Sequence, residues 1–165
     1  MLALNALRFA ERSFIVVAFL LMVFLYFGSV ITREIGGDVA TSFAWVEEAV
    51  RVLNLFMVFF GLGLALERGR HVGIRNLRAK LPPKVCQGLL RVTDLIGLLF
   101  SGYIAWIGIE MVTFVLNSGQ RSPTLGIPMG YIYLAPTVGF VLLALRYGLS
   151  LVGLIDRFSG EETAE

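Results

Sequence analysis

Two acidic residues and one basic residue, Glu47, Glu48 and Arg51, stand directly before a long uncharged segment. The fifteen residues 52–66 carry no charge, but fifteen helical residues cover only about 22 Å of a hydrocarbon core about 30 Å thick. The helix must therefore extend into the charged group, which lies at a membrane boundary. Arg51 follows the acids by three and four residues, the spacing of ion pairs along a helix. Such a group can bind a partner protein or a lipid headgroup, and a solvated helix start is the simpler alternative.

Two further carboxyl groups, Asp94 and Glu110, interrupt the next apolar segment. Ionisable residues within membrane segments are candidates for ion or proton transfer. Asp94 lies three residues after Arg91, so a local ion pair is its simpler interpretation. Glu110 lies sixteen residues further on, about 24 Å along a helix, near the opposite boundary, where a carboxylate that snorkels to the outer interface is its simpler interpretation. The two carboxyl groups do not converge, so the sequence predicts no catalytic constellation and no enzyme.

Arg70 and His71 follow the second apolar segment, where basic groups suit a helix C-terminus or phosphate headgroups. A solvated interfacial histidine is the simpler alternative. The chain has one histidine and one cysteine, Cys86, which argues against a metal site and excludes an internal disulfide. We expect no metal and no cofactor in this chain.

The composition is that of an integral membrane protein. The 165 residues are 57% apolar and 16% charged, with mean hydropathy +0.80, whereas soluble domains average about 45–50% apolar and about 25% charged. The net charge of +2 and the position of the basic residues at segment ends argue against nucleic acid as a partner.

The apolar segments predict one all-α membrane domain with four transmembrane helices, over residues 13–31, 46–66, 91–116 and 128–147. The first segment has nineteen residues and exceeds the about 7–15 of a signal peptide, so we expect it to remain as a span. Pro136 should kink the fourth. Residues 71–82 have apolar positions at helical spacing between basic ones, which predicts a short interfacial amphipathic helix, with a plain basic loop as the alternative. The acidic tail 159–165 should be disordered.

Small residues recur at three- and four-residue steps in two of these segments. Gly61 and Ala65 form one ridge, and Gly97, Ser101 and Ala105 form the other. Such ridges let two membrane helices approach closely. They can join helices of this chain or contact a partner subunit.

The basic residues predict the orientation. Eleven of the fourteen fall in the N-terminal segment, the connection after the second span and the C-terminal end. The positive-inside rule therefore places both termini in the cytoplasm, with the connections 32–45 and 117–127 outside.

Several short motifs together match one known pattern. They are Trp45-x-Glu47-Glu48-x-x-Arg51, Gly61, Arg70-His71-Val72-x-Ile74-x-x-Leu77-x-x-x-Leu81-Pro82, Leu125-x-Ile127-Pro128 and Pro136-x-x-Gly139. These residues resemble the DctQ-like small membrane subunit of tripartite ATP-independent periplasmic (TRAP) transporters. The specific part of the likeness lies between Trp45 and Pro82, and the whole covers about Arg12 to Leu151. Arg75 departs from the family pattern, in which an acid is common.

The resemblance implies a bacterial inner-membrane complex. A large membrane subunit holds the substrate and sodium and moves as an elevator, and a periplasmic substrate-binding protein delivers an organic acid. The small subunit is then a non-catalytic brace, surrounded by lipid, that can help to dock the binding protein. The alternative is an autonomous, homo-oligomeric, proton- or ion-coupled transporter that uses Glu110 or Asp94. The candidate subunit- and lipid-contacting residues are Glu47, Glu48, Arg51, Gly61, Ala65, Arg70, His71, Gly97, Ser101 and Ala105.

Overall fold

Five helices make up the described part of the chain, residues 2–67 and 83–153 of a computed structural model. They are α1 (Leu2–Ile35), α2 (Gly37–Ser42), α3 (Trp45–Glu67), α5 (Pro83–Asn117) and α6 (Gly130–Leu151). Four segments of these ranges are long and apolar enough to cross a membrane, and each contains one of the four long helices. The predicted all-α membrane fold with four spans is confirmed. Arg70, His71, the expected interfacial segment 71–82 and the tail 159–165 lie outside the described residues.

The helices are longer than the apolar segments that predict them. Helix α1 includes Arg8, Glu11 and Arg12 before its apolar part, and α5 begins eight residues before the expected boundary. Hydropathy identifies only the part of a helix that lies in lipid. Charged residues can continue the same helix beyond that part. Pro83 is the first residue of α5, where the missing N–H of proline costs no hydrogen bond. Helix α6 continues through Pro136.

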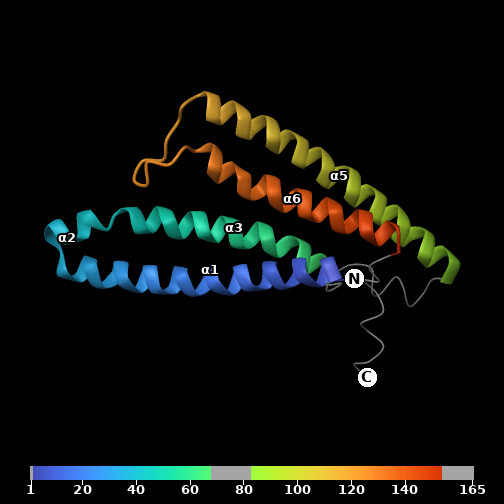
Figure 1. Ribbon diagram of the computed structural model, residues 1–165, viewed down its shortest axis with the longest axis horizontal. Coiled ribbons are helices and arrows are strands. Elements are labelled where there is room, and N and C mark those ends of the chain that lie inside the picture. Colours follow the sequence, from blue (N-terminus) through green and yellow to red (C-terminus); the bar gives the residue numbers. More distant parts are fainter. Residues whose placement is uncertain (1, 68–82, 154–165) are drawn as a thin grey trace, which may run out of the picture.

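The four long helices stand in a single row in the order α1, α3, α6, α5 (Figure 1). Helix α1 packs on α3, α3 packs on α6, and α6 packs on α5. Within the described ranges α1 and α5 share no extensive interface, so the row does not close into a bundle. Both faces of the layer and both of its edges are therefore left without a helical neighbour from these ranges. Large apolar side chains such as Phe24 on α1 and Phe114 on α5 are accordingly exposed.

Glycines bring the helices of the row together. A Cβ atom on Gly139 of α6 would lie 2.8 Å from the backbone oxygen of Phe59 of α3. A Cβ atom on Gly108 of α5 would lie 2.5 Å from Oγ1 of Thr137 of α6. At such distances no side chain fits, so these crossings depend on glycine. The loop between α5 and α6, residues 118–129, and the short α2 lie at the same end of the row, which we call the loop end (Figure 1).

Candidate functional site

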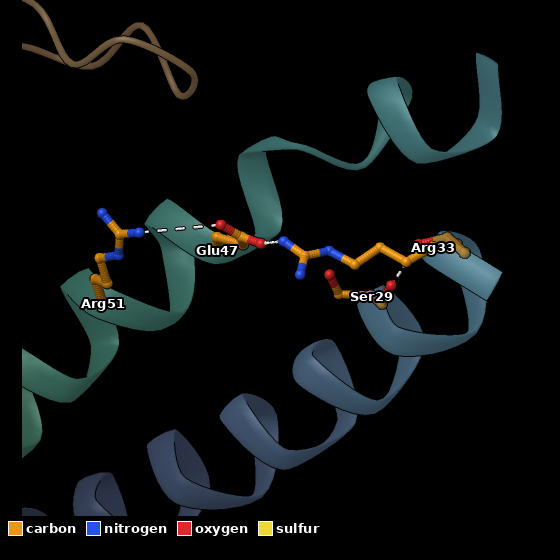
Figure 2. Close-up of polar contacts among 5 residues, drawn as sticks. Ser29, Arg33, Glu47 and Arg51 are labelled. Atoms are coloured by element: carbon orange, nitrogen blue, oxygen red, sulfur yellow. Dashed lines mark hydrogen bonds and ion pairs between the residues drawn. The ribbon is translucent and has the colours of Figure 1, made fainter. Parts of the chain in front are cut away.

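At the loop end, a chain of charged side chains joins the last turn of α1 to the first turns of α3. Arg33 of α1 pairs with Oε1 of Glu47, and Nη2 of Arg51 lies 3.9 Å from the other oxygen of Glu47 (Figure 2). The helix turn that carries Arg33 is held by Thr32, whose hydroxyl donates to the backbone oxygen of Ser29 at 2.9 Å. The Arg51 side chain is 80% exposed, and exposed ion pairs contribute little stability. Arg51 is therefore accessible to a partner or a lipid headgroup.

Glu48 makes a different set of contacts from its neighbour Glu47. Its Oε2 atom accepts hydrogen bonds from the backbone N–H groups of Thr124 at 2.9 Å and Leu125 at 3.0 Å, and from the Thr124 hydroxyl. The 118–129 loop is itself ordered by backbone hydrogen bonds, among them Ser122 N–H to Ile127 O at 2.9 Å. Glu48 thus attaches the loop between α5 and α6 to the start of α3. We call this contact the loop clasp.

Towards the end of the helices opposite the loop end, an ion pair lies buried between two helices that are not neighbours. Arg146 of α6 pairs with Glu11 of α1, and the two side chains are 1% and 2% exposed. The guanidinium passes α3 at Gly63, where a Cβ atom would lie 2.5 Å from Nη1 of Arg146. The missing side chain of Gly63 therefore provides the passage across α3. This pair (the buried pair) connects the first, second and third helices of the row.

Sequence reasoning did not find the buried pair. It counted basic residues near both chain ends for the orientation and assigned no partner to Arg146 or Glu11. One signal was present, because Arg146 is the first charge after Arg121 in a long uncharged segment. Such an arginine needs a nearby acid. The sequence offers several acids, however, and only the order of the helices selects Glu11.

The ridge of Gly97, Ser101 and Ala105 lies inside the seam between α5 and α6. Gly97 faces the ring of Tyr147, which would lie 2.4 Å from a Cβ atom there. Ser101 and Ala105 are buried, and the Ser101 hydroxyl donates to the backbone oxygen of Gly97 at 2.6 Å. These residues join two helices of this chain.

Asp94 continues the same seam. It is buried, and its Oδ2 atom accepts a hydrogen bond from the Ser150 hydroxyl of α6 at 2.6 Å. The contact crosses between helices, whereas the simple expectation was a local pair with Arg91. Asp94 is thereby tied into the packing of α5 on α6.

The other ridge, Gly61 and Ala65, faces outward. A Cβ atom on Gly61 would meet nothing within 4 Å, and Ala65 is exposed. Glu110 is exposed as well, on α5, and accepts a hydrogen bond from Nε1 of Trp106 at 3.1 Å. Gly61, Ala65 and Glu110 are thus available to neighbours outside the described residues, in contrast to the seam.

The described residues provide several surfaces for packing. They contain no group of three or more His, Cys, Asp or Glu side chains that could hold a metal ion. A shallow groove of about 450 Å³ runs along α1. Its lining includes Phe19 and Met22 of α1 and Val50 of α3. A smaller hollow of about 260 Å³ at the loop end includes Arg33 and Glu47. Both suit contact with lipid or protein.

Comparison with known families decides the class of protein. Residues 22–157 match the family model described as the DctQ component of tripartite ATP-independent periplasmic transporters. The chain belongs to this DctQ family. The resemblance to this family that the sequence indicates is thereby confirmed.

Individual relatives agree with this assignment. The chain is 31% identical over 103 residues to the C4-dicarboxylate TRAP transporter small permease protein DctQ of Rhodobacter capsulatus. The aligned residues make up 62% of this chain and 45% of the relative. It is 27% identical over 100 residues to the ectoine TRAP transporter small permease protein TeaB of Halomonas elongata, covering 61% of this chain and 52% of that one. The chain thus spans about half the length of these curated relatives.

A third relative has a different organisation. The isethionate TRAP transporter permease protein DctMQ of Oleidesulfovibrio alaskensis is 23% identical over 148 residues, which are 88% of this chain but only 23% of that protein. Most of this DctQ-family chain therefore corresponds to one part of a much longer permease polypeptide.

Proposed function

We propose that this chain is the non-catalytic brace of a sodium-coupled TRAP transporter for an organic acid in the bacterial inner membrane. Its task is to hold and widen the scaffold of a large membrane subunit. The large subunit carries the substrate and sodium sites, so this chain binds neither sodium nor another cofactor.

The observation that supports this function best is the open row of helices. A transporter that works alone needs polar groups around a path through its own interior. Here Asp94 is held in the α5–α6 seam by Ser150, and Glu110 lies on the outside of α5. A row with two uncovered faces is suited instead to lying against a larger protein, as the long DctMQ relative suggests.

The loop end has the features needed to assist docking of the periplasmic substrate-binding protein. The loop clasp orders the 118–129 loop, and Arg51 extends from the neighbouring helix turn. This role requires the loop end to face the periplasm and both termini to face the cytoplasm, as the distribution of basic residues predicts. The relatives' names give different substrates, C4-dicarboxylate, ectoine and isethionate, so we assign the choice of substrate to other subunits.

Reconstitution tests the proposal. Proteoliposomes with this chain, the large subunit and the loaded binding protein should take up the substrate in a sodium gradient. Proteoliposomes with this chain alone should take up none. Uptake by the chain alone that is abolished by Glu110→Gln would contradict the brace function and support the autonomous transporter.

A further inference from the structure

Glu110 occupies an unusual position for an acidic side chain. It lies within the membrane-crossing part of α5, on the side that the chain leaves exposed. Asn117, the last residue of α5, lies seven positions further on, about 10 Å along the helix. The six residues between them are apolar except Thr113, whose hydroxyl donates to the backbone oxygen of Glu110 at 2.8 Å. Glu110 therefore lies about two helical turns inside the end of the candidate span.

The side chain also points away from the nearer water. Oε1 of Glu110 accepts its hydrogen bond from Nε1 of Trp106, one turn earlier in α5. Helical side chains lean toward the N-terminus of their helix. For Glu110 this direction leads deeper into the membrane, so the carboxyl group is not a snorkelling group that reaches the loop end.

The Trp106 indole is the only hydrogen-bond donor that the described residues supply to this carboxyl group. A carboxyl group has two acceptor oxygens, and hydrocarbon tails donate no hydrogen bonds. Acidic residues in membrane segments consequently face protein or water and pair with donors. Glu110 therefore needs a further donor, from protein or water, outside the described residues.

The surroundings of Glu110 form a continuous surface. Tyr103, Trp106, Glu110 and Phe114 follow at helical spacing along α5, and the three aromatic residues are each about two-thirds exposed. This set, the α5 stripe, lies opposite the buried residues Ser101, Ala105 and Val112 of the α6 seam. Because α5 is the outermost helix on one side of the row, the stripe forms an edge of the layer.

We propose that the α5 stripe is the docking surface for a transmembrane helix of the large membrane subunit, which presents an Arg or Lys side chain to Glu110. This inference rests on the proposed function. Charge complementarity selects the occupant. Lipid tails donate no hydrogen bond to the carboxyl group, and a periplasmic protein lies outside the candidate span. A second copy of this chain would bring its own Glu110, and its stripe contains no basic residue. The long DctMQ relative is consistent with a partner that is itself a permease.

The first experiment replaces Glu110 in the complex purified with the large subunit. Glu110→Leu should lower the recovery of the large subunit about tenfold, since the charged hydrogen bond between the helices is lost. The isolated Glu110→Leu chain should be at least as thermostable as the wild type, because a lipid-facing polar group has been removed. Ile109→Leu, at the adjacent and also exposed position, is the matched control and should leave the recovery unchanged. Undiminished recovery with Glu110→Leu would overturn the proposal.

The second experiment maps the contact directly in native membranes. A photo-crosslinking amino acid at Tyr103 or Phe114 should form a product with the large subunit, whereas the same amino acid at Phe24, equally exposed on α1, should react mainly with lipid. Products with the large subunit from Phe24 alone would move the interface to α1 and overturn the proposal while leaving the brace function intact. Products between two copies of this chain from Tyr103 would also overturn it. If the wild-type chain captures no large subunit at all, the proposed function itself fails.

Discussion

The guanidinium of Arg146 and the carboxyl group of Glu11 form a buried ion pair, although 135 residues separate them in the chain. The two helices that carry them, α6 and α1, are not neighbours in the row. The pair spans the intervening α3 where Gly63 leaves room. Charged groups that are buried in this way are costly to separate. The pair therefore fixes the order and the register of three helices at once.

Replacing Gly63 with alanine should block the path of the Arg146 side chain across α3. The new Cβ atom would lie 2.5 Å from Nη1 and 3.0 Å from Cζ of Arg146, so the guanidinium must move away from Glu11. We expect a loss of about 3 kcal/mol or more in stability, as when one partner leaves a buried ion pair. Thermal unfolding of the purified chain measures the loss.

Gly61→Ala is the matched control for this substitution. It lies in the same helix, and its Cβ atom would meet nothing within 4 Å. In a helix interior alanine is more favourable than glycine by about 1 kcal/mol, so Gly61→Ala should be neutral or stabilising. Equal effects of the two substitutions would show that Gly63 does not serve as the passage.

The buried pair should be replaceable as a unit but not one residue at a time. Glu11→Leu or Arg146→Met alone leaves a buried charge without its counter-charge and should cost about 3–5 kcal/mol. The double variant removes both charges and should recover most of that loss, since a well-packed apolar pair is often as stable as an ion pair. Unfolding of the four proteins of this double-mutant cycle gives the coupling energy. Additive losses would mean that Glu11 and Arg146 act independently.

Labelling of single cysteines tests the orientation. With Cys86 replaced by serine, Ser42→Cys and Gln120→Cys should react with an impermeant thiol reagent in intact cells, because both positions are exposed at the loop end. Native Cys86, near the start of α5, should react only after the membrane is opened. The opposite pattern would place the loop end in the cytoplasm and would remove its proposed role in docking the binding protein.

The sequence predicts the number of membrane-spanning helices well, because long apolar segments have few alternatives in a membrane. It also singles out the close-packing residues Gly97, Ser101 and Ala105, which the structure places in the α5–α6 seam. It cannot predict that the helices form an open row, since hydropathy does not specify which helices are neighbours. The partners of Arg146 and Asp94 depend on that order, and for this reason Glu11 and Ser150 were not foreseen.

Local spacing was also an incomplete guide to the charged group before the second span. Their spacing places Glu47, Glu48 and Arg51 close together on one helix, and Glu47 does lie near Arg51. Glu48, however, binds a loop that comes 76 residues later. Adjacent residues on a helix point about 100° apart, so two neighbouring acids can serve different partners.

The loop clasp should be sensitive to Glu48 and insensitive to Glu47. Glu48→Ala removes the acceptor of the Thr124 and Leu125 N–H groups, so these two amides should exchange with deuterium faster by about one order of magnitude. Glu47→Ala removes an equal charge from the adjacent position but only the pairs with Arg33 and Arg51, so the exchange of the loop amides should be unchanged. If both variants accelerate exchange equally, the loop responds to the net charge at the loop end rather than to hydrogen bonds from Glu48. If neither does, the backbone hydrogen bonds within residues 118–129 are sufficient to order the loop, and Glu48 would have no role in presenting it to the binding protein.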